Sequence, residues 1–236
     1  MSNFVLIPGA WHGGWAWRPV ARRLRDEGHG AFTPTLPGLG DEKRLGDEKR
    51  RGHSLDEAAD FIVDYIETRD LQDVVLVAHS WGGYPVTGAA PRLEKRLSKL
   101  VYWSAFIPAE GKTPLQEGAP EAEDMWREMA AASGDDSILL PFELWQAAFI
   151  QSAPEAVQRL THELLVPQPL AHFTETVTPL KPDFGVPITY LLSSDDHALQ
   201  PGGYAQRLGV SPVAVTGDHE AHLTNPDALA KALLNA

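Results

Sequence analysis

Ser80 is the residue whose surroundings most clearly indicate chemistry. It lies in the segment Ala78-His79-Ser80-Trp81-Gly82, which follows a short apolar run and precedes a helix-compatible stretch. A buried strand that turns directly into a helix places such a serine on a strained turn, with its hydroxyl at the end of the sheet. The residues two before and two after it must be small, and Ala78 and Gly82 meet this requirement. Ser80 is therefore the candidate nucleophile, and His79 is expected to pack.

Acids and histidines follow two later apolar runs. Asp195 and Asp196 come directly after one run, and His219 and His222 come after the last one. A serine hydroxyl is a weak nucleophile, so it needs a base, and that base needs an orienting carboxylate. These four side chains are the candidates for the two roles.

The elements that must position these residues alternate along the chain. Short runs rich in Val, Ile and Leu alternate with amphipathic stretches, a pattern typical of parallel strands connected by helices. The predicted fold class is therefore α/β, with a doubly wound, mostly parallel sheet whose site lies at the carboxyl ends of the strands. Ser54 and Glu57 form a capping-box pattern at one helix start. The predicted strands are 3–7, 30–34, 73–78, 98–104, 187–193 and 210–215, and the predicted helices are 16–28, 55–68, 82–96, 202–208 and 225–234.

Residues 108–186 interrupt this alternation. The segment is mainly helical and punctuated by proline, and an insertion of this length above the strand ends is typical of a cap. We expect an α/β core at 1–107 and 187–236 and a helical cap or lid at 108–186. Aromatic residues suggest an apolar pocket, although at least half of those in the cap would serve its own small core. The candidate pocket residues are Trp11, Trp126, Phe142, Trp145 and Phe149.

Composition excludes several classes of protein. The 236 residues include no cysteine, so disulfides, thiolate metal sites and a cysteine nucleophile are excluded. The net charge of −12 disfavours nucleic acid and anionic membrane surfaces as partners. No apolar run approaches the length of a membrane span, and no secretion signal is recognised, so we expect a cytoplasmic protein. The charged repeat at 40–44 and 46–50 is expected to be a solvated loop.

Several motifs together carry a family resemblance. They lie at 4–17, 36–40, 78–83, 165–170 and 217–219, and so extend over nearly the whole chain. With them the sequence resembles the α/β-hydrolase superfamily, in particular its branch of small esterases related to methyl-ester esterases and hydroxynitrile lyases. Ala78 stands where the first glycine of the serine motif is more usual, and Pro8 where histidine often stands.

The resemblance implies roles for the remaining site residues. In this superfamily the acid follows the serine and the histidine comes last. The branch pattern selects Asp196 as the acid and His219 as the base. Asp195 is the alternative acid and otherwise a turn residue, and His222 is expected to pack or to contact the cap.

The resemblance also implies an oxyanion hole. Its two donors are expected to be the backbone amides of Trp81 and of Ala10, on the loop after the first strand. His12 is expected to hold that loop by hydrogen bonds. The proposed reaction needs no metal and no organic cofactor.

The expected function is hydrolysis of small to medium carboxylic esters through an acyl-enzyme. A thioesterase, or a C–C bond hydrolase or cyclase on a polyketide-like substrate, would use the same residues, and a ligand-sensing receptor is the alternative from another class. Cyanohydrin cleavage is disfavoured because Glu220 stands where lyases of the branch carry lysine, and its negative charge would repel cyanide. Gly9 stands where they tend to carry threonine. The expected partner is a small-molecule ester, and the protein is expected to be a monomer or a homodimer.

Overall fold

A six-stranded parallel sheet forms the centre of the molecule. The computed structural model describes residues 1–40, 53–118, 120–199 and 203–236. The strand order is β2-β1-β3-β4-β7-β8, and each neighbouring pair in it is parallel. This confirms the predicted α/β class and its doubly wound sheet. The strands are β1 (Asn3–Ile7), β2 (Gly30–Phe32), β3 (Val74–His79), β4 (Leu97–Trp103), β7 (Ile188–Ser193) and β8 (Val213–Val215).

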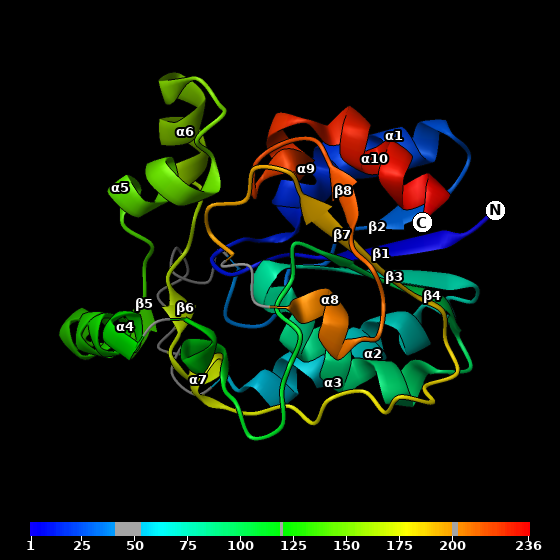
Figure 1. The fold of residues 1–236 in the computed structure, drawn as a ribbon, viewed down its shortest axis with the longest axis horizontal. Helices are drawn as coiled ribbons and strands as arrows, with labels where there is room; N and C mark the ends of the chain where they lie inside the picture. The colour runs from blue at the N-terminus through cyan, green and yellow to red at the C-terminus, as the bar shows by residue number, and fades with distance from the viewer. Residues whose placement is uncertain (41–52, 119, 200–202) are drawn as a thin grey trace.

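Helices cover both faces of this sheet (Figure 1). One face packs against α1 (Arg18–Asp26), α9 (Ala221–Thr224) and α10 (Pro226–Asn235). The other packs against α2 (Leu55–Thr68) and α3 (Gly83–Leu93), with α8 (Tyr204–Arg207) on the same side. Because both faces are covered, β3 is buried along its whole length, as its run of Val and Leu predicts.

The start of α2 follows the predicted capping box. The Glu57 amide donates to the Ser54 hydroxyl at 3.0 Å, and the Ser54 amide donates to the Glu57 carboxylate at 2.9 Å. Two amides that lack partners inside the helix are thus satisfied. Residues 41–52, which include most of the charged repeat, lie outside the described residues, so its predicted loop structure is not described. Within the described ranges, no helix is both long and apolar enough to cross a membrane.

The chain leaves the sheet after β4 and returns to it at β7, which pairs directly with β4. The residues between are called the insertion (108–186). Its last part, 176–184, runs along α2 and α3 back to β7, whereas its helices lie beyond the carboxyl ends of the strands (Figure 1). They surround the edge of the sheet at which Ser80 is found. The elements of the insertion are η4 (Pro114–Glu117), α4 (Pro120–Ser133), β5 (Ser137–Ile138), α5 (Phe142–Leu144), the π-helix η5 (Trp145–Phe149), α6 (Glu155–His162), β6 (Gln168–Pro169) and α7 (Ala171–Thr174).

Candidate active site

Ser80 lies on a sharp turn between β3 and α3. Its φ angle is +52°, a left-handed conformation that is costly for a residue with a side chain and is found at functional turns. Close backbone approach explains the small neighbours, because a Cβ atom on Gly82 would lie 2.6 Å from the Pro8 carbonyl oxygen. Ala78 is fully buried beside β1. The local sequence therefore produces the strained turn, and Ser80 lines a cavity.

His219 and Asp196 lie together at the same edge of the sheet. The Nδ1 atom of His219 is 2.9 Å from Oδ2 of Asp196 and 3.1 Å from Oδ1. Both side chains are almost completely buried, with 1% and 4% of their surfaces exposed. The Nε2 atom of His219 makes no hydrogen bond to the described residues, and His219 lines the same cavity as Ser80. An orienting carboxylate on Nδ1 with Nε2 unengaged is the arrangement that a general base requires.

The Asp196 carboxylate is stabilised in its charged form. Its Oδ1 atom accepts the amides of Ala198 at 3.1 Å and Leu199 at 2.8 Å. Burial alone would raise its pKa, but the charge and hydrogen bond of His219 and the Leu199 amide outweigh burial, and the pKa is lowered. Asp195 instead faces the exposed His197, with 3.0 Å between Oδ1 and Nε2. The structure thus places Asp196, rather than Asp195, beside His219.

The loop after β1 lies beside Ser80. Ala10 and Trp81, whose amides are the predicted oxyanion donors, both line the cavity. The His12 ring donates from Nδ1 to the Ala10 carbonyl at 2.6 Å, which confirms that this histidine holds the loop. Trp11 has a φ of +63°, and its amide donates to Oε1 of Gln168 at 2.7 Å. The sequence indicates no role for Gln168 beyond its place in the motif at 165–170.

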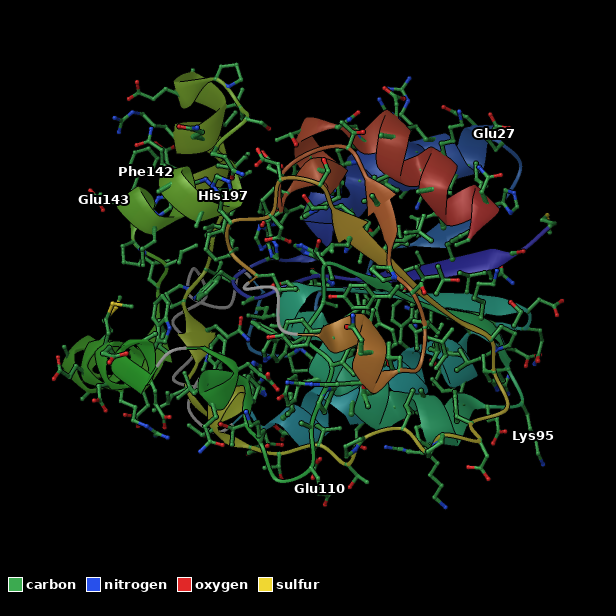
Figure 2. The ribbon with its side chains drawn as sticks, viewed as in Figure 1. Glu27, Lys95, Glu110, Phe142, Glu143 and His197 are labelled. Atoms are coloured by element: carbon green, nitrogen blue, oxygen red, sulfur yellow. The ribbon has the colours of Figure 1, made fainter. Side chains whose placement is uncertain are left out.

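The cavity has a volume of about 410 Å³ and a mainly apolar wall. Trp11, Trp126 and Phe149 line it, as predicted for these three candidates. His197 also lines it, and Figure 2 shows this residue on the side of the core that faces the insertion. The other described residues of the wall are Phe106, Pro114, Leu115, Gly118, Ala122, Met125, Ile138, Leu144, Ala148, Phe173, Ala198 and Leu199.

Two predicted pocket residues do not line this cavity. Trp145 is fully buried in the insertion, where its indole donates to the Gln158 carbonyl at 3.0 Å and its ring stacks on Phe149. Phe142 packs under the Arg159 guanidinium and against the His162 ring instead. These two aromatics belong to the insertion's own packing, whereas Leu144 of α5 and Phe149 of η5 line the cavity. Apolar character alone does not predict this difference.

A family model and a solved structure each match almost the whole chain. Residues 4–232 match the model of the alpha/beta hydrolase family. The chain belongs to this family. An extracellular α/β-hydrolase from a Paenibacillus species has a similar structure, with 27% identity, a TM-score of 0.90 and coverage of 100% of this chain and 99% of that one.

Esterases are prominent among the relatives of this α/β-hydrolase. Methylesterase 18 of Arabidopsis thaliana is 28% identical, covering 99% of this chain and 96% of that protein. The carbendazim hydrolyzing esterase of a Nocardioides species is 43% identical over 111 residues, which are 47% of this chain and 45% of that protein. The chain is accordingly an enzyme, an esterase of the α/β-hydrolase type.

Glu220 does not have the role predicted from the sequence. Its side chain is fully buried next to His219 in this α/β-hydrolase and does not line the cavity. Its Oε2 atom lies 3.2 Å from Nε2 of His222 and 3.4 Å from Nε2 of His12. Burial, followed by the charges of Asp218 and Asp196, raises the pKa of Glu220 well above its usual range. This position does not match the sequence argument that a Glu220 charge repels cyanide, because the side chain does not line the cavity and burial favours its uncharged form.

The same side chains have the donor types found in metal sites. Two groups of described residues place donor atoms within 4.8 Å of one another: His12, Glu220 and His222, and His79, His219 and Glu220. Burial lowers the pKa of His12 to about 4 and that of His79 and His222 well below the usual range. Burial thus favours the uncharged form of each of these side chains. His79 also contacts His219 directly, with 3.1 Å between its Nε2 and the His219 carbonyl oxygen.

A Glu220→Gln variant tests whether the buried carboxyl is neutral. The folded protein keeps the Glu220 proton as pH rises, whereas the unfolded chain releases it above the ordinary glutamate pKa of about 4.3. Wild-type stability should therefore fall with rising pH by an amount that the glutamine variant does not show. We expect the free energy of unfolding of Glu220→Gln, relative to wild type, to be higher at pH 8 than at pH 5 in urea titrations.

The exposed Glu128 provides the control for that comparison. A Glu128→Gln replacement on α4 should show no such pH-dependent difference, because its carboxyl is on the surface. No pH-dependent difference between Glu220→Gln and wild type, or a difference of the opposite sign, would contradict a raised pKa for the Glu220 carboxyl.

Proposed function

We propose that Ser80 is the nucleophile, His219 the general base and Asp196 the residue that orients the base. One observation carries the proposal: the left-handed turn at Ser80 and the His219–Asp196 pair meet at one apolar cavity. The amides of Ala10 and Trp81 are the proposed oxyanion donors, because both residues line the cavity beside Ser80.

The proposed reaction has two steps. His219 Nε2 takes the proton of the Ser80 hydroxyl while Oγ attacks the ester carbonyl, and the oxyanion is stabilised by the two amides. The tetrahedral intermediate collapses, the leaving alkoxide takes the proton from His219, and an acyl-serine remains. Water then gives a proton to His219 and attacks the acyl group, which releases the carboxylic acid and restores the serine. Asp196 holds the imidazole in the tautomer with a proton on Nδ1 throughout.

The proposed substrates are uncharged esters of small to medium size. The described wall of the cavity contains no lysine or arginine, so a second carboxylate or a phosphate on the substrate would be desolvated without a cationic partner. A volume of about 410 Å³ and six tryptophan and phenylalanine side chains suit an apolar or aromatic acyl or leaving group. We propose that the insertion is a cap that excludes water from this space.

A substrate panel tests this specificity. Methyl and p-nitrophenyl esters of neutral aliphatic and aromatic acids should be hydrolysed, whereas matched half-esters with a free carboxylate should show much lower kcat/KM. Carbendazim belongs in the panel because a relative 43% identical over 111 residues is named for hydrolysing it.

Other outcomes of the panel would assign another function. Preference for thioesters or for C–C cleavage next to a carbonyl would contradict the ester assignment while retaining the triad. A single slow turnover that leaves a persistent adduct would instead indicate a ligand-sensing receptor. Preference for the charged half-esters would contradict the proposed substrate class.

A further inference from the structure

A short segment of the insertion contacts both loops that carry the proposed base and acid. Residues 149–152, which we call the bracing segment, begin at the last residue of the π-helix η5 and reach the loops after β7 and β8. We propose that the bracing segment positions the His219 and Asp196 side chains, with Ser152 as its main positioning residue. This inference rests on the proposed function, because it concerns the geometry of the same triad.

The strongest contact joins Ser152 to Asp218, the residue before the proposed base. Asp218 is fully buried, and its Oδ2 atom accepts both the amide of Ser152, at 3.2 Å, and the Ser152 hydroxyl. Its Oδ1 atom accepts the Glu220 amide at 3.1 Å and the Thr224 hydroxyl at 2.8 Å. A buried carboxylate needs such donors, and half of these four come from the insertion. The conformation of the His219 loop therefore depends on Ser152.

Phe149 adds a second contact to the same loop. Its carbonyl accepts the Glu220 amide at 3.3 Å, and the edge of its ring meets the His219 ring at 90° with 5.3 Å between centroids. The His79 ring lies 4.7 Å from the His219 ring, and Asp196 holds Nδ1. The His219 side chain thus contacts Phe149, His79 and Asp196. Of these three, Phe149 belongs to the insertion, and it also lines the cavity.

Gln151 extends the contact to the loop of the acid. Its Nε2 atom donates to the Asp195 carbonyl at 2.7 Å, one residue before Asp196. The bracing segment is itself held by the buried Gln158, whose Nε2 atom donates to the carbonyls of Ile150 and Ala153 at 3.1 and 3.0 Å. Gln158 belongs to α6, so the hydrogen bonds that hold the bracing segment come from within the insertion. Through the bracing segment, the insertion contacts the loop of the proposed acid and the loop of the proposed base.

Ser152→Ala is the direct test, with Ser133→Ala as the matched control. Ser152 is otherwise exposed, whereas the Ser133 hydroxyl bonds only within the insertion, to the Ala130 carbonyl and the amides of Asp135 and Ser137. We expect Ser152→Ala to lower kcat for p-nitrophenyl acetate by roughly 10- to 100-fold with little change in KM, as small displacements of a catalytic group do. Ser152→Thr, which keeps the hydroxyl, should restore kcat, and Ser133→Ala should behave as wild type.

The outcomes separate this inference from the proposed function. Wild-type kcat in Ser152→Ala, a change confined to KM, or failure of Ser152→Thr to restore kcat would each overturn the positioning role. Gln151→Ala, measured in parallel, should also lower kcat, because it removes the hydrogen bond to the loop that carries Asp196. A wild-type kcat in Gln151→Ala would show that the bracing segment does not position Asp196. Thermal melts of all variants check that they are folded. If Ser80→Ala retained activity, the proposed function itself would be overturned.

Discussion

Replacing Ser80 with alanine is expected to lower kcat for ester hydrolysis by roughly 10⁶-fold, the scale found when a serine nucleophile is removed from a triad. The hydroxyl is the one group at the strained turn that can form the acyl-enzyme, and the described residues contain no cysteine to replace it. A small methyl group at this position leaves the cavity and the His219–Asp196 pair in place. The binding of an uncharged ester should therefore change little while turnover is lost.

Ser98 provides the control for this variant. It lies on the exposed side of β4, so Ser98→Ala should retain wild-type kcat and KM. The measurement is steady-state hydrolysis of a p-nitrophenyl ester at matched protein concentration, with thermal melts to show that both variants are folded. Substantial activity in Ser80→Ala would remove Ser80 from the nucleophile's role.

Asp196→Asn is expected to lower kcat by roughly 10⁴-fold. An asparagine amide at this position can hold the imidazole in the tautomer with the proton on Nε2, which cannot accept the Ser80 proton. It also removes the charge that stabilises the imidazolium during acyl transfer. The shape of the site is preserved, because asparagine and aspartate are nearly isosteric.

Asp195→Asn is the matched control, since the two acids are adjacent in the sequence. Asp195 is paired with the exposed His197 and should contribute little to turnover. We expect Asp195→Asn to keep kcat close to that of wild type. The reverse ranking of the two variants, measured with the same ester, would move the acid role to Asp195.

Regular alternation in the sequence was sufficient to predict the sheet. The predicted strands at 3–7 and 187–193 coincide closely with β1 and β7. The apolar run of β3 is buried along its whole length, as expected for a strand covered on both faces. The turn at Ser80 was equally predictable, since the close approach of backbones leaves room only for small residues on either side. A catalytic residue whose position depends on local backbone geometry can thus be predicted from the neighbouring residues in the sequence.

Side-chain direction in the insertion was not predictable in this way. Phe142 and Trp145 are as aromatic as Trp126 and Phe149, yet only the latter two reach the cavity. Trp145 and Phe149 both lie in the π-helix η5, whose non-α geometry no hydrophobic period reveals. The direction of Glu220 was missed for a related reason, because its burial depends on His12 and His222 from distant parts of the chain.

Long-range hydrogen bonds were also invisible in the sequence. Gln168 lies 157 residues from Trp11, whose amide it accepts, and Ser152 lies 66 residues from Asp218. Both pairs join the insertion to a loop of the proposed active site. Such contacts follow from how the insertion packs on the strand ends, and a single sequence carries no local signal for them.

Intact-mass measurement after treatment with a fluorophosphonate tests the central claim most directly. The reagent phosphonylates a serine whose proton is removed by a neighbouring base, so it reports nucleophile activation without any assumption about the natural ester. We predict one adduct per chain for the wild type, located at Ser80 by peptide mapping, slow labelling in Asp196→Asn and none in Ser80→Ala. An unlabelled wild type, or an adduct that persists in Ser80→Ala, would contradict the proposed Ser80-His219-Asp196 triad.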